Sequence, residues 1–293
     1  MKVIQAKSAG FCYGVQRAVE LAEQTARERG GCVMLGSIIH NAHVVQHLEQ
    51  LGAHQVAGPE EIRPGDTVLI RAHGEKKQVI GHLKDIGAEC VDATCPNVLR
   101  VQQIVAQADA EGRVPIIIGD PNHPEVMGVA SWSARSVVFE GAEALQRWLD
   151  EDPARRELPL TAVAQTTCIR IIWDGAAEIL KKQCTNAKIF DTICNATHKR
   201  QSEAAELASQ VDVMVVVGDR KSANTKHLTE ICSRQCPAVY QIERAEELKR
   251  DFLTGCSVAG LTAGASTPAG IIKEVYTTMS EEIKTMEPTE ESF

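Results

Sequence analysis

Three cysteines occupy positions where a short apolar run gives way to a helix-like stretch. Ten cysteines occur in the 293 residues, and Cys12, Cys95 and Cys194 each lie at a predicted strand-to-helix turn. A helix N-terminus stabilises a thiolate, the form of cysteine that binds metal. The three thiols are too far apart in sequence for a local CxxC site. They are therefore either ligands of one shared metal centre or three ordinary buried thiols.

The other seven cysteines give weaker signals. Those in or beside apolar runs are interpreted as core residues: Cys32, Cys90, Cys168, Cys184 and Cys256. Cys232 and Cys236 are one helical turn apart and could share a metal ion. The nearby Pro237 predicts a helix end there, and packing is the favoured interpretation.

Histidines, hydroxyls and an amide also follow predicted strands. His40, His73 and His123 come after three different runs, and a neutral imidazole donates a hydrogen bond without carrying charge. A second group precedes predicted helices, where short polar residues either cap the helix or help bind an anion: Ser222, Asn224 and Ser266. The sequence has no Walker-A loop and no GxGxxG fingerprint, so an ordinary nucleotide enzyme is not indicated.

One acidic residue lies beside these candidates. Glu125 follows His123 and Pro124 just past a predicted strand. A carboxyl group in a closed pocket can have its pKa raised and can transfer protons. Thr166 and Thr167, after a neighbouring strand, could extend such a relay. An exposed glutamate in a turn is the alternative.

The elements that must position these residues alternate along the chain. Short β-branched runs followed by amphipathic stretches predict βαβ units with mainly parallel sheets, whose ligands bind at the carboxyl ends of the strands. A weak repeat, Asp92–Cys95 and Asp191–Cys194, suggests three similar small α/β modules facing a common centre. The strand-like runs lie at residues 3–6, 33–38, 67–71, 89–93, 114–119, 161–165, 188–193, 211–218 and 257–262.

Composition excludes several classes of protein. The formal net charge is −8, the pI is about 5.6 and aromatic residues make up 4%, which disfavours nucleic-acid binding. No apolar run is long enough to span a membrane, and the N-terminus does not resemble a signal peptide. We therefore expect a cytoplasmic protein without membrane or nucleic-acid partners, in which disulfides are disfavoured.

Taken together, the motifs closely resemble the 4-hydroxy-3-methylbut-2-enyl diphosphate reductase (LytB/IspH) family. The set is far more specific than any one member, and it runs in the family's order through residues 10–15, 39–41, 71–74, 92–96, 122–126, 165–167, 191–194, 200–201, 221–224 and 262–266. The resemblance implies three α/β modules with pseudo-threefold symmetry around a central iron–sulfur cluster. We place them at residues 14–95, 96–192 and 193–280, the third joined by an N-terminal strand in 1–13. A C-terminal tail at 281–293 receives no role.

The resemblance also implies roles for individual residues. Cys12, Cys95 and Cys194 would bind a 4Fe–4S cluster whose fourth iron stays open to substrate, with a 3Fe–4S form arising where that iron is lost. Glu125, Thr166 and His123 would be catalytic. Residues implied to contact the substrate and its diphosphate are His40, His73, His123, Thr166, Thr197, Ser222, Ala223, Asn224 and Ser266. Many family members have serine at the position of Ala223, where a backbone N–H can still donate.

The implied reaction is the reductive dehydroxylation of (E)-4-hydroxy-3-methylbut-2-enyl diphosphate to isopentenyl and dimethylallyl diphosphate, the last step of the methylerythritol phosphate pathway. Because no flavin or nicotinamide fingerprint is visible, the electrons would come from ferredoxin or flavodoxin. The alternatives are a non-redox iron–sulfur hydro-lyase acting on a diphosphate, a cluster-based redox or iron sensor, and a zinc site made by the same cysteines.

Overall fold

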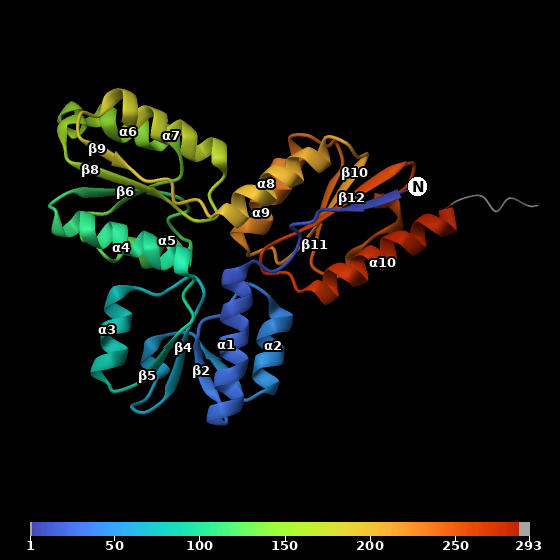
Figure 1. Cartoon of the computed structure of the whole chain (residues 1–293), viewed down its shortest axis with the longest axis horizontal. Helices are drawn as coiled ribbons and strands as arrows, with labels where there is room; N and C mark the ends of the chain where they lie inside the picture. Colours follow the sequence, from blue (N-terminus) through green and yellow to red (C-terminus); the bar gives the residue numbers. More distant parts are fainter. Residues whose placement is uncertain (1, 287–293) are drawn as a thin grey trace, which may run out of the picture. The chain divides into compact units, whose positions relative to one another are not determined.

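A computed structural model describes residues 2–286, and it divides the chain into two compact units. The central unit is Tyr13–Cys194. The terminal unit combines Met1–Cys12 with Asn195–Phe293. The central unit contains two parallel four-stranded sheets and the terminal unit contains one, and helices cover each of them, as the alternating pattern predicts (Figure 1).

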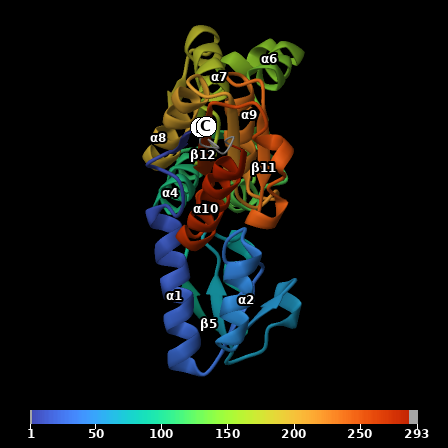
Figure 2. The same cartoon turned by 90° about the vertical axis from the view of Figure 1, so that its right-hand side faces the viewer.

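The first sheet of the central unit has the strand order β3-β2-β4-β5 and is parallel throughout. Its strands are β2 (Cys32–Leu35), β3 (Ala53–Val56), β4 (Thr67–Ile70) and β5 (Glu89–Asp92), and its helices are α1 (Tyr13–Arg29), α2 (Ala42–Gln50) and α3 (Lys77–Asp85). Leu83 of α3 packs on one face of the sheet with Val33 and Val68. Helices α1 and α2 lie on the other face (Figure 2).

The second sheet of the central unit, β7-β6-β8-β9, repeats that order. Its elements are α4 (Pro96–Ala110), β6 (Val114–Ile118), α5 (Pro124–Ala130), β7 (Val137–Phe139), α6 (Ala142–Glu151), β8 (Leu160–Ala164), α7 (Arg170–Gln183) and β9 (Ala187–Ile189). Ile117 and Val163 face α4 and α5, whereas Ile116 faces α6 and α7. The sheet is thus buried on both sides, which explains its continuous apolar strands.

The terminal unit contains the third sheet, in the order β1-β12-β10-β11. Its elements are β1 (Lys2–Gln5), α8 (Asn195–Ala208), β10 (Val213–Val217), α9 (Ala223–Ser233), β11 (Val239–Ile242), β12 (Val258–Ala263) and α10 (Ala269–Met286). Helix α10 packs on one face, and α8 and α9 pack on the other (Figure 1). Helix α10 continues to Met286 and so includes the first residues of the predicted tail at 281–293, whereas residues 287–293 lie outside the described residues.

The three sheets share one topology. The orders β3-β2-β4-β5, β7-β6-β8-β9 and β11-β10-β12-β1 correspond strand by strand. The N-terminal strand β1 takes the place in the terminal sheet that β5 and β9 take in the other two. This confirms the predicted fold class of similar α/β modules with parallel sheets. The module boundaries at residues 95 and 192 stay a prediction.

The sequence pattern does not predict β3, β7 or β11, each of which lies at one edge of its sheet. Each has only three or four residues. Polar side chains interrupt two of them, because an edge strand does not need continuous apolar residues. Helices α5 and α6 lie between the predicted runs at 114–119 and 161–165, in a stretch to which no element is assigned from the sequence. Short 3₁₀ segments complete the chain at Pro59–Glu61, Pro153–Glu157, Ala245–Glu247 and Arg250–Phe252.

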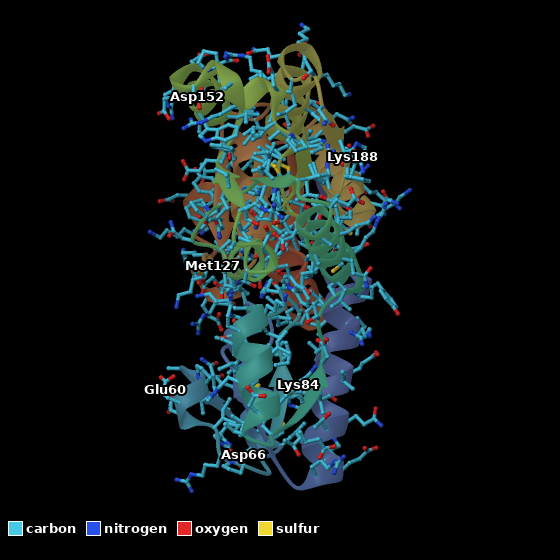
Figure 3. The ribbon with its side chains drawn as sticks, turned by 90° about the vertical axis from the view of Figure 1, so that its left-hand side faces the viewer. Glu60, Asp66, Lys84, Met127, Asp152 and Lys188 are labelled. Atoms are coloured by element: carbon cyan, nitrogen blue, oxygen red, sulfur yellow. The ribbon has the colours of Figure 1, made fainter. Side chains whose placement is uncertain are left out.

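Charged side chains cover the outside of the central unit. Glu60, Lys84, Asp152 and Lys188 are exposed and labelled in Figure 3. Surface ion pairs such as Lys188 Nζ to Glu111 Oε2, at 2.7 Å, join charges of opposite sign. Among residues 2–286, no helix combines the length and apolar character needed to cross a membrane.

Candidate active site

The turn after the first strand of each sheet is built the same way. A glycine follows the strand, and its N–H donates to the carbonyl of the last residue of the neighbouring edge strand. The three bonds are Gly36 to Val56 at 3.1 Å, Gly119 to Phe139 at 2.9 Å and Gly218 to Ile242 at 2.9 Å. Four residues after these glycines come His40, His123 and Ser222. The shared backbone places three predicted site residues at equivalent strand ends.

The cysteines lie on a second repeated bond. Each donates its backbone N–H to a carbonyl two residues beyond the third strand of its sheet: Cys95 to Ala72 at 2.9 Å, Cys194 to Thr166 at 3.0 Å and Cys12 to Ala265 at 3.3 Å. Each cysteine directly precedes a helix, α4, α8 or α1. Their placement at helix N-termini is confirmed.

The sequence repeat around two of these cysteines is also structural. Asp92 Oδ1 accepts the N–H of Thr94 at 2.9 Å, and Asp191 Oδ1 accepts the N–H of Ile193 at 3.2 Å. The same aspartate turn therefore leads into both Cys95 and Cys194. The terminal unit reaches Cys12 without an aspartate.

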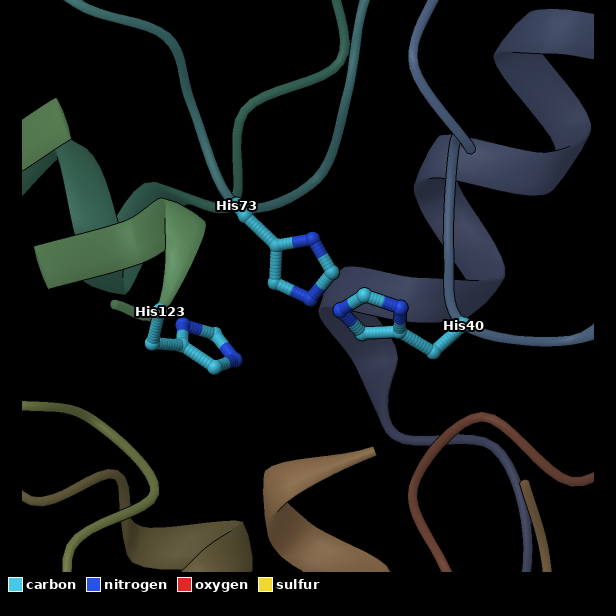
Figure 4. A group of neighbouring side chains, drawn as sticks. All are labelled: His40, His73 and His123. Atoms are coloured by element: carbon cyan, nitrogen blue, oxygen red, sulfur yellow. The ribbon is translucent and has the colours of Figure 1, made fainter. Parts of the chain in front are cut away.

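Three histidine rings meet in the central unit (Figure 4). The ring centroids lie 4.7 Å apart for His40 and His73, 5.3 Å for His73 and His123, and 6.0 Å for His40 and His123. One nitrogen from each ring lies within 4.8 Å of the others. Such a group can either bind a metal ion or donate hydrogen bonds to an anion.

The electrostatics of the cluster favour a neutral ring at His73. The pKa of His73 lies well below its ordinary value, because burial disfavours the charged ring and His40, His123 and Arg71 add positive charge nearby. His123 Nδ1 accepts the N–H of Glu125 at 3.1 Å and caps α5. The proton of neutral His123 must therefore be on Nε2, which becomes a donor.

Glu125 is a buried acid, not an exposed turn residue. It is 2% exposed, and both carboxyl oxygens meet Thr166: Oε1 accepts the backbone N–H at 2.6 Å and Oε2 accepts the hydroxyl at 2.8 Å. Burial raises the pKa of Glu125 to about 7, although both bonds from Thr166 lower it. The group can therefore give or take a proton near neutral pH.

The terminal unit carries the hydroxyl and amide candidates. Ser222 caps α9 by accepting the N–H of Thr225 at 3.4 Å, and Ala223 is the first helical residue. Asn224 is 3% exposed, and within the described residues neither polar atom of its side chain has a hydrogen-bond partner. Ser266, also buried, follows the adjacent strand β12.

One further predicted residue belongs to the terminal unit. Thr197 is buried in the first turn of α8. Three residues later, buried Arg200 donates to the carbonyls of Ser8 at 2.9 Å and Gly10 at 2.6 Å. Arg200 thus holds the loop that leads to Cys12. The sequence motif contained Arg200 but gave it no role, because nothing in the sequence shows that an arginine will be buried.

The surroundings of the cysteines fit a thiolate-bound cluster. A Cβ on Gly14 would lie 2.5 Å from Cys95 Sγ, so only glycine leaves room for that sulfur. Asn97 Nδ2 donates to Cys194 Sγ at 3.1 Å. No disulfide forms between cysteines of residues 2–286. Cys12, Cys95 and Cys194 are all half-buried, and therefore accessible to a group bound at the strand ends.

The remaining cysteines are poor ligands. Burial raises the pKa of Cys168 and of Cys232 to about 12, and it also raises the pKa of Cys32, Cys90, Cys184 and Cys256. A raised pKa disfavours the thiolate. Cys232 and Cys236 pack in the core of the terminal sheet, which agrees with the packing interpretation.

Fold and site together define an α/β enzyme whose candidate groups all lie at the carboxyl ends of parallel strands. The family model described as LytB protein matches residues 3–280. The chain belongs to the LytB family.

The relatives and solved structures agree. The chain is 39% identical to 4-hydroxy-3-methylbut-2-enyl diphosphate reductase of Caldanaerobacter subterraneus subsp. tengcongensis, covering 100% of both chains. It is 38% identical to the same-named protein of Nitratiruptor, covering 94% of this chain and 97% of the relative. The predicted family and the prediction of an oxidoreductase are confirmed.

Two solved structures share the fold. One is described as (E)-4-hydroxy-3-methyl-but-2-enyl diphosphate reductase, the terminal enzyme of the non-mevalonate pathway. It is 38% identical with a TM-score of 0.68, over 96% of this chain and 100% of that one. The other is an E-1-hydroxy-2-methyl-but-2-enyl-4-diphosphate reductase from Plasmodium falciparum. It is 25% identical with a TM-score of 0.90, over 95% of this chain and 88% of that one.

Proposed function

We propose that this chain removes the hydroxyl of (E)-4-hydroxy-3-methylbut-2-enyl diphosphate reductively, giving isopentenyl and dimethylallyl diphosphate in the last step of the methylerythritol phosphate pathway. Two electrons and two protons enter, the C–O bond breaks, a C–H bond forms and water leaves. The observation that carries the proposal is the match to same-named reductases over the whole chain. The buried Glu125–Thr166 pair supports it, because the reaction needs a proton source.

The diphosphate is bound by neutral donors. The central unit offers three imidazoles, of which His123 donates through Nε2. The terminal unit offers Ser222, Asn224, Ser266 and the backbone N–H of Ala223 at the N-terminus of α9. A helix N-terminus stabilises negative charge without an arginine clamp. A neutral imidazole can bind either an anion or a metal ion, and we assign the histidine cluster to the diphosphate because the same-named relatives act on a diphosphate.

The cysteines hold the cofactor. Cys95 and Cys194 supply two thiolates, and Cys12 supplies the third. When bound, a 4Fe–4S cluster with three thiolate ligands supplies electrons and a Lewis-acidic iron with an open position. Glycine at position 14 leaves the Cys95 sulfur uncovered. Ferredoxin or flavodoxin delivers the electrons.

Glu125 delivers the protons through Thr166. When Glu125 is protonated, its carboxyl donates to the Thr166 hydroxyl, which reverses direction because a hydroxyl both donates and accepts. The bond from the backbone N–H of Thr166 holds the other carboxyl oxygen in place. Thr197 and His123 order the substrate and water near this relay.

Anaerobic turnover with a reduced viologen dye, on protein of known iron content, tests the proposal. We expect dye oxidation with formation of the two five-carbon diphosphates. Loss of water without any reductant would instead favour a hydro-lyase, and an intact cluster without turnover would favour a sensor. A colourless, zinc-loaded protein would contradict the cofactor assignment.

Single substitutions test the ligands. Cys12→Ser, Cys95→Ser and Cys194→Ser are each expected to lower the iron content and abolish most turnover. Cys256→Ser, a half-buried cysteine outside the proposed site, is the matched control and should keep its iron. Full iron and activity in any of the three variants would remove that cysteine from the ligand set.

A further inference from the structure

The sulfur of Cys194 accepts a hydrogen bond from a residue of the central unit that is distant in sequence. Asn97 is the second residue of α4, directly after Pro96, and it lies 97 residues before Cys194 in the chain. Its side-chain nitrogen Nδ2 lies 3.1 Å from Cys194 Sγ. Pro96 suits the first turn of a helix, and it fixes the backbone from which Asn97 projects.

The chemistry of this contact depends on the thiolate. A thiolate can only accept a hydrogen bond, and the amide group of asparagine has two N–H donors. Asn97 is exposed, so core packing does not hold its side chain against Cys194. The contact places a neutral donor on one of the three sulfurs proposed to bind the cluster.

We propose that Asn97 is a positioning residue that raises the reduction potential of the cluster through Cys194, an inference that rests on the proposed function. A donated hydrogen bond withdraws negative charge from the thiolate sulfur. An electron added to the cluster is then less strongly repelled, so the reduced form is stabilised. Asn97 keeps its own protons, and no bond is made or broken. The residue thereby determines how strong an electron donor must be.

The test is a redox titration of the cluster-loaded full chain, followed by electron paramagnetic resonance. Asn97→Leu removes the donor at similar size, and Asn97→Asp replaces it with a negative charge. We expect the midpoint potential to fall from the native chain to Asn97→Leu and further to Asn97→Asp. Asn97→Ser keeps a shorter donor, and its midpoint potential should lie between those of the native chain and Asn97→Leu.

Turnover provides a second readout. With a strongly reducing dye, Asn97→Leu should keep its turnover number and the KM for the diphosphate substrate. With a weaker donor its turnover number should fall. Gln103→Leu removes an exposed amide from the same helix α4, and it is the matched control that should leave the potential unchanged.

The outcomes separate this inference from the proposed function. An intact cluster whose potential is the same in the native chain, Asn97→Leu and Asn97→Asp overturns the role of Asn97 alone. A shift as large in Gln103→Leu also overturns it, because the effect would then come from the helix surface in general. A chain that binds no cluster overturns the inference and the proposed cofactor together.

Discussion

The turns after β6 and after β10 have nearly the same backbone and different chemistry. In both, an aspartate follows the glycine, and its carbonyl accepts the N–H of the capping residue at 3.0 Å: Asp120 from His123, and Asp219 from Ser222. Both aspartates also accept an N–H at Oδ1, from Asn122 at 2.8 Å and from Lys221 at 2.6 Å. The backbone is therefore a repeated scaffold.

What differs is the residue two positions after the cap. After β6 it is Glu125, bonded twice to Thr166. After β10 it is Asn224, which is as buried as Glu125 but carries an amide in place of a carboxyl group. A carboxyl at this place exchanges protons, whereas an amide can only bind. One fold position, the first turn of a helix after a parallel strand, thus holds a group that can exchange protons in one unit and a group that can only form hydrogen bonds in the other, which is the division of roles that we propose.

The largest expected effect comes from removing the acid while keeping its shape. Glu125→Gln should still accept the N–H of Thr166 and bind substrate, but kcat should fall by a factor of about 10² to 10⁴ because no proton is delivered. Steady-state kinetics and iron content measure this. Glu143→Gln, which changes an exposed residue of α6, is the control, and a normal kcat in Glu125→Gln would exclude Glu125 from the proton path.

The reverse exchange places an acid in the terminal unit. Asn224→Asp puts a buried carboxylate beside the proposed diphosphate site, where like charges repel. We expect KM to rise about ten- to hundredfold with a smaller change in kcat. A KM equal to that of the native chain would show that Asn224 does not contact the anion.

The third prediction concerns pH. Glu125 has a pKa of about 7, so its proton-donating form is lost above that pH. The turnover number should fall about tenfold per pH unit above neutrality. A pH profile of kcat tests this, and the decline should disappear in Glu125→Gln.

The same pKa has a consequence for stability. Because it is raised above the ordinary 4.5, the folded chain holds this proton more tightly than the unfolded chain does. That stabilisation is full below pH 4.5 and is lost as the pH rises through about 7, by roughly 3 kcal/mol at most. Denaturant unfolding of the native chain and Glu125→Gln at pH 5 and pH 8 tests this; equal pH dependence in the two would contradict it.

The smallest effect concerns the cap. Ser222→Ala loses the long bond to Thr225 and should lower the free energy of unfolding by about 0.5–1 kcal/mol, with a modest rise in KM. Ser222→Thr, which keeps a hydroxyl, should restore most of both. If Ser222→Ala lowered kcat as strongly as Glu125→Gln does, the division of roles between the two turns would be wrong.

Much of the fold could be predicted from the sequence. Continuous apolar runs such as Val213–Val217 become strands buried on both faces, and the residues after them fall at the strand ends. The edge strands β3, β7 and β11 could not be predicted; β3, for example, contains His54 and Gln55 and depends on pairing with β2 for its structure. Asn97 carried no signal, because its partner Cys194 is far away in sequence.

The sequence by itself determined the class of fold, the family and the residue types available at each strand end. Local pattern suffices for these, because hydrophobic periodicity and turn residues act over a few positions. Only the tertiary structure decided the state of each group. It brought His40, His73 and His123 together, buried Glu125 against Thr166, and placed the amide of Asn97 on Cys194. Burial and long-range hydrogen bonds shift protons and charge, and both depend on neighbours that the linear order does not reveal.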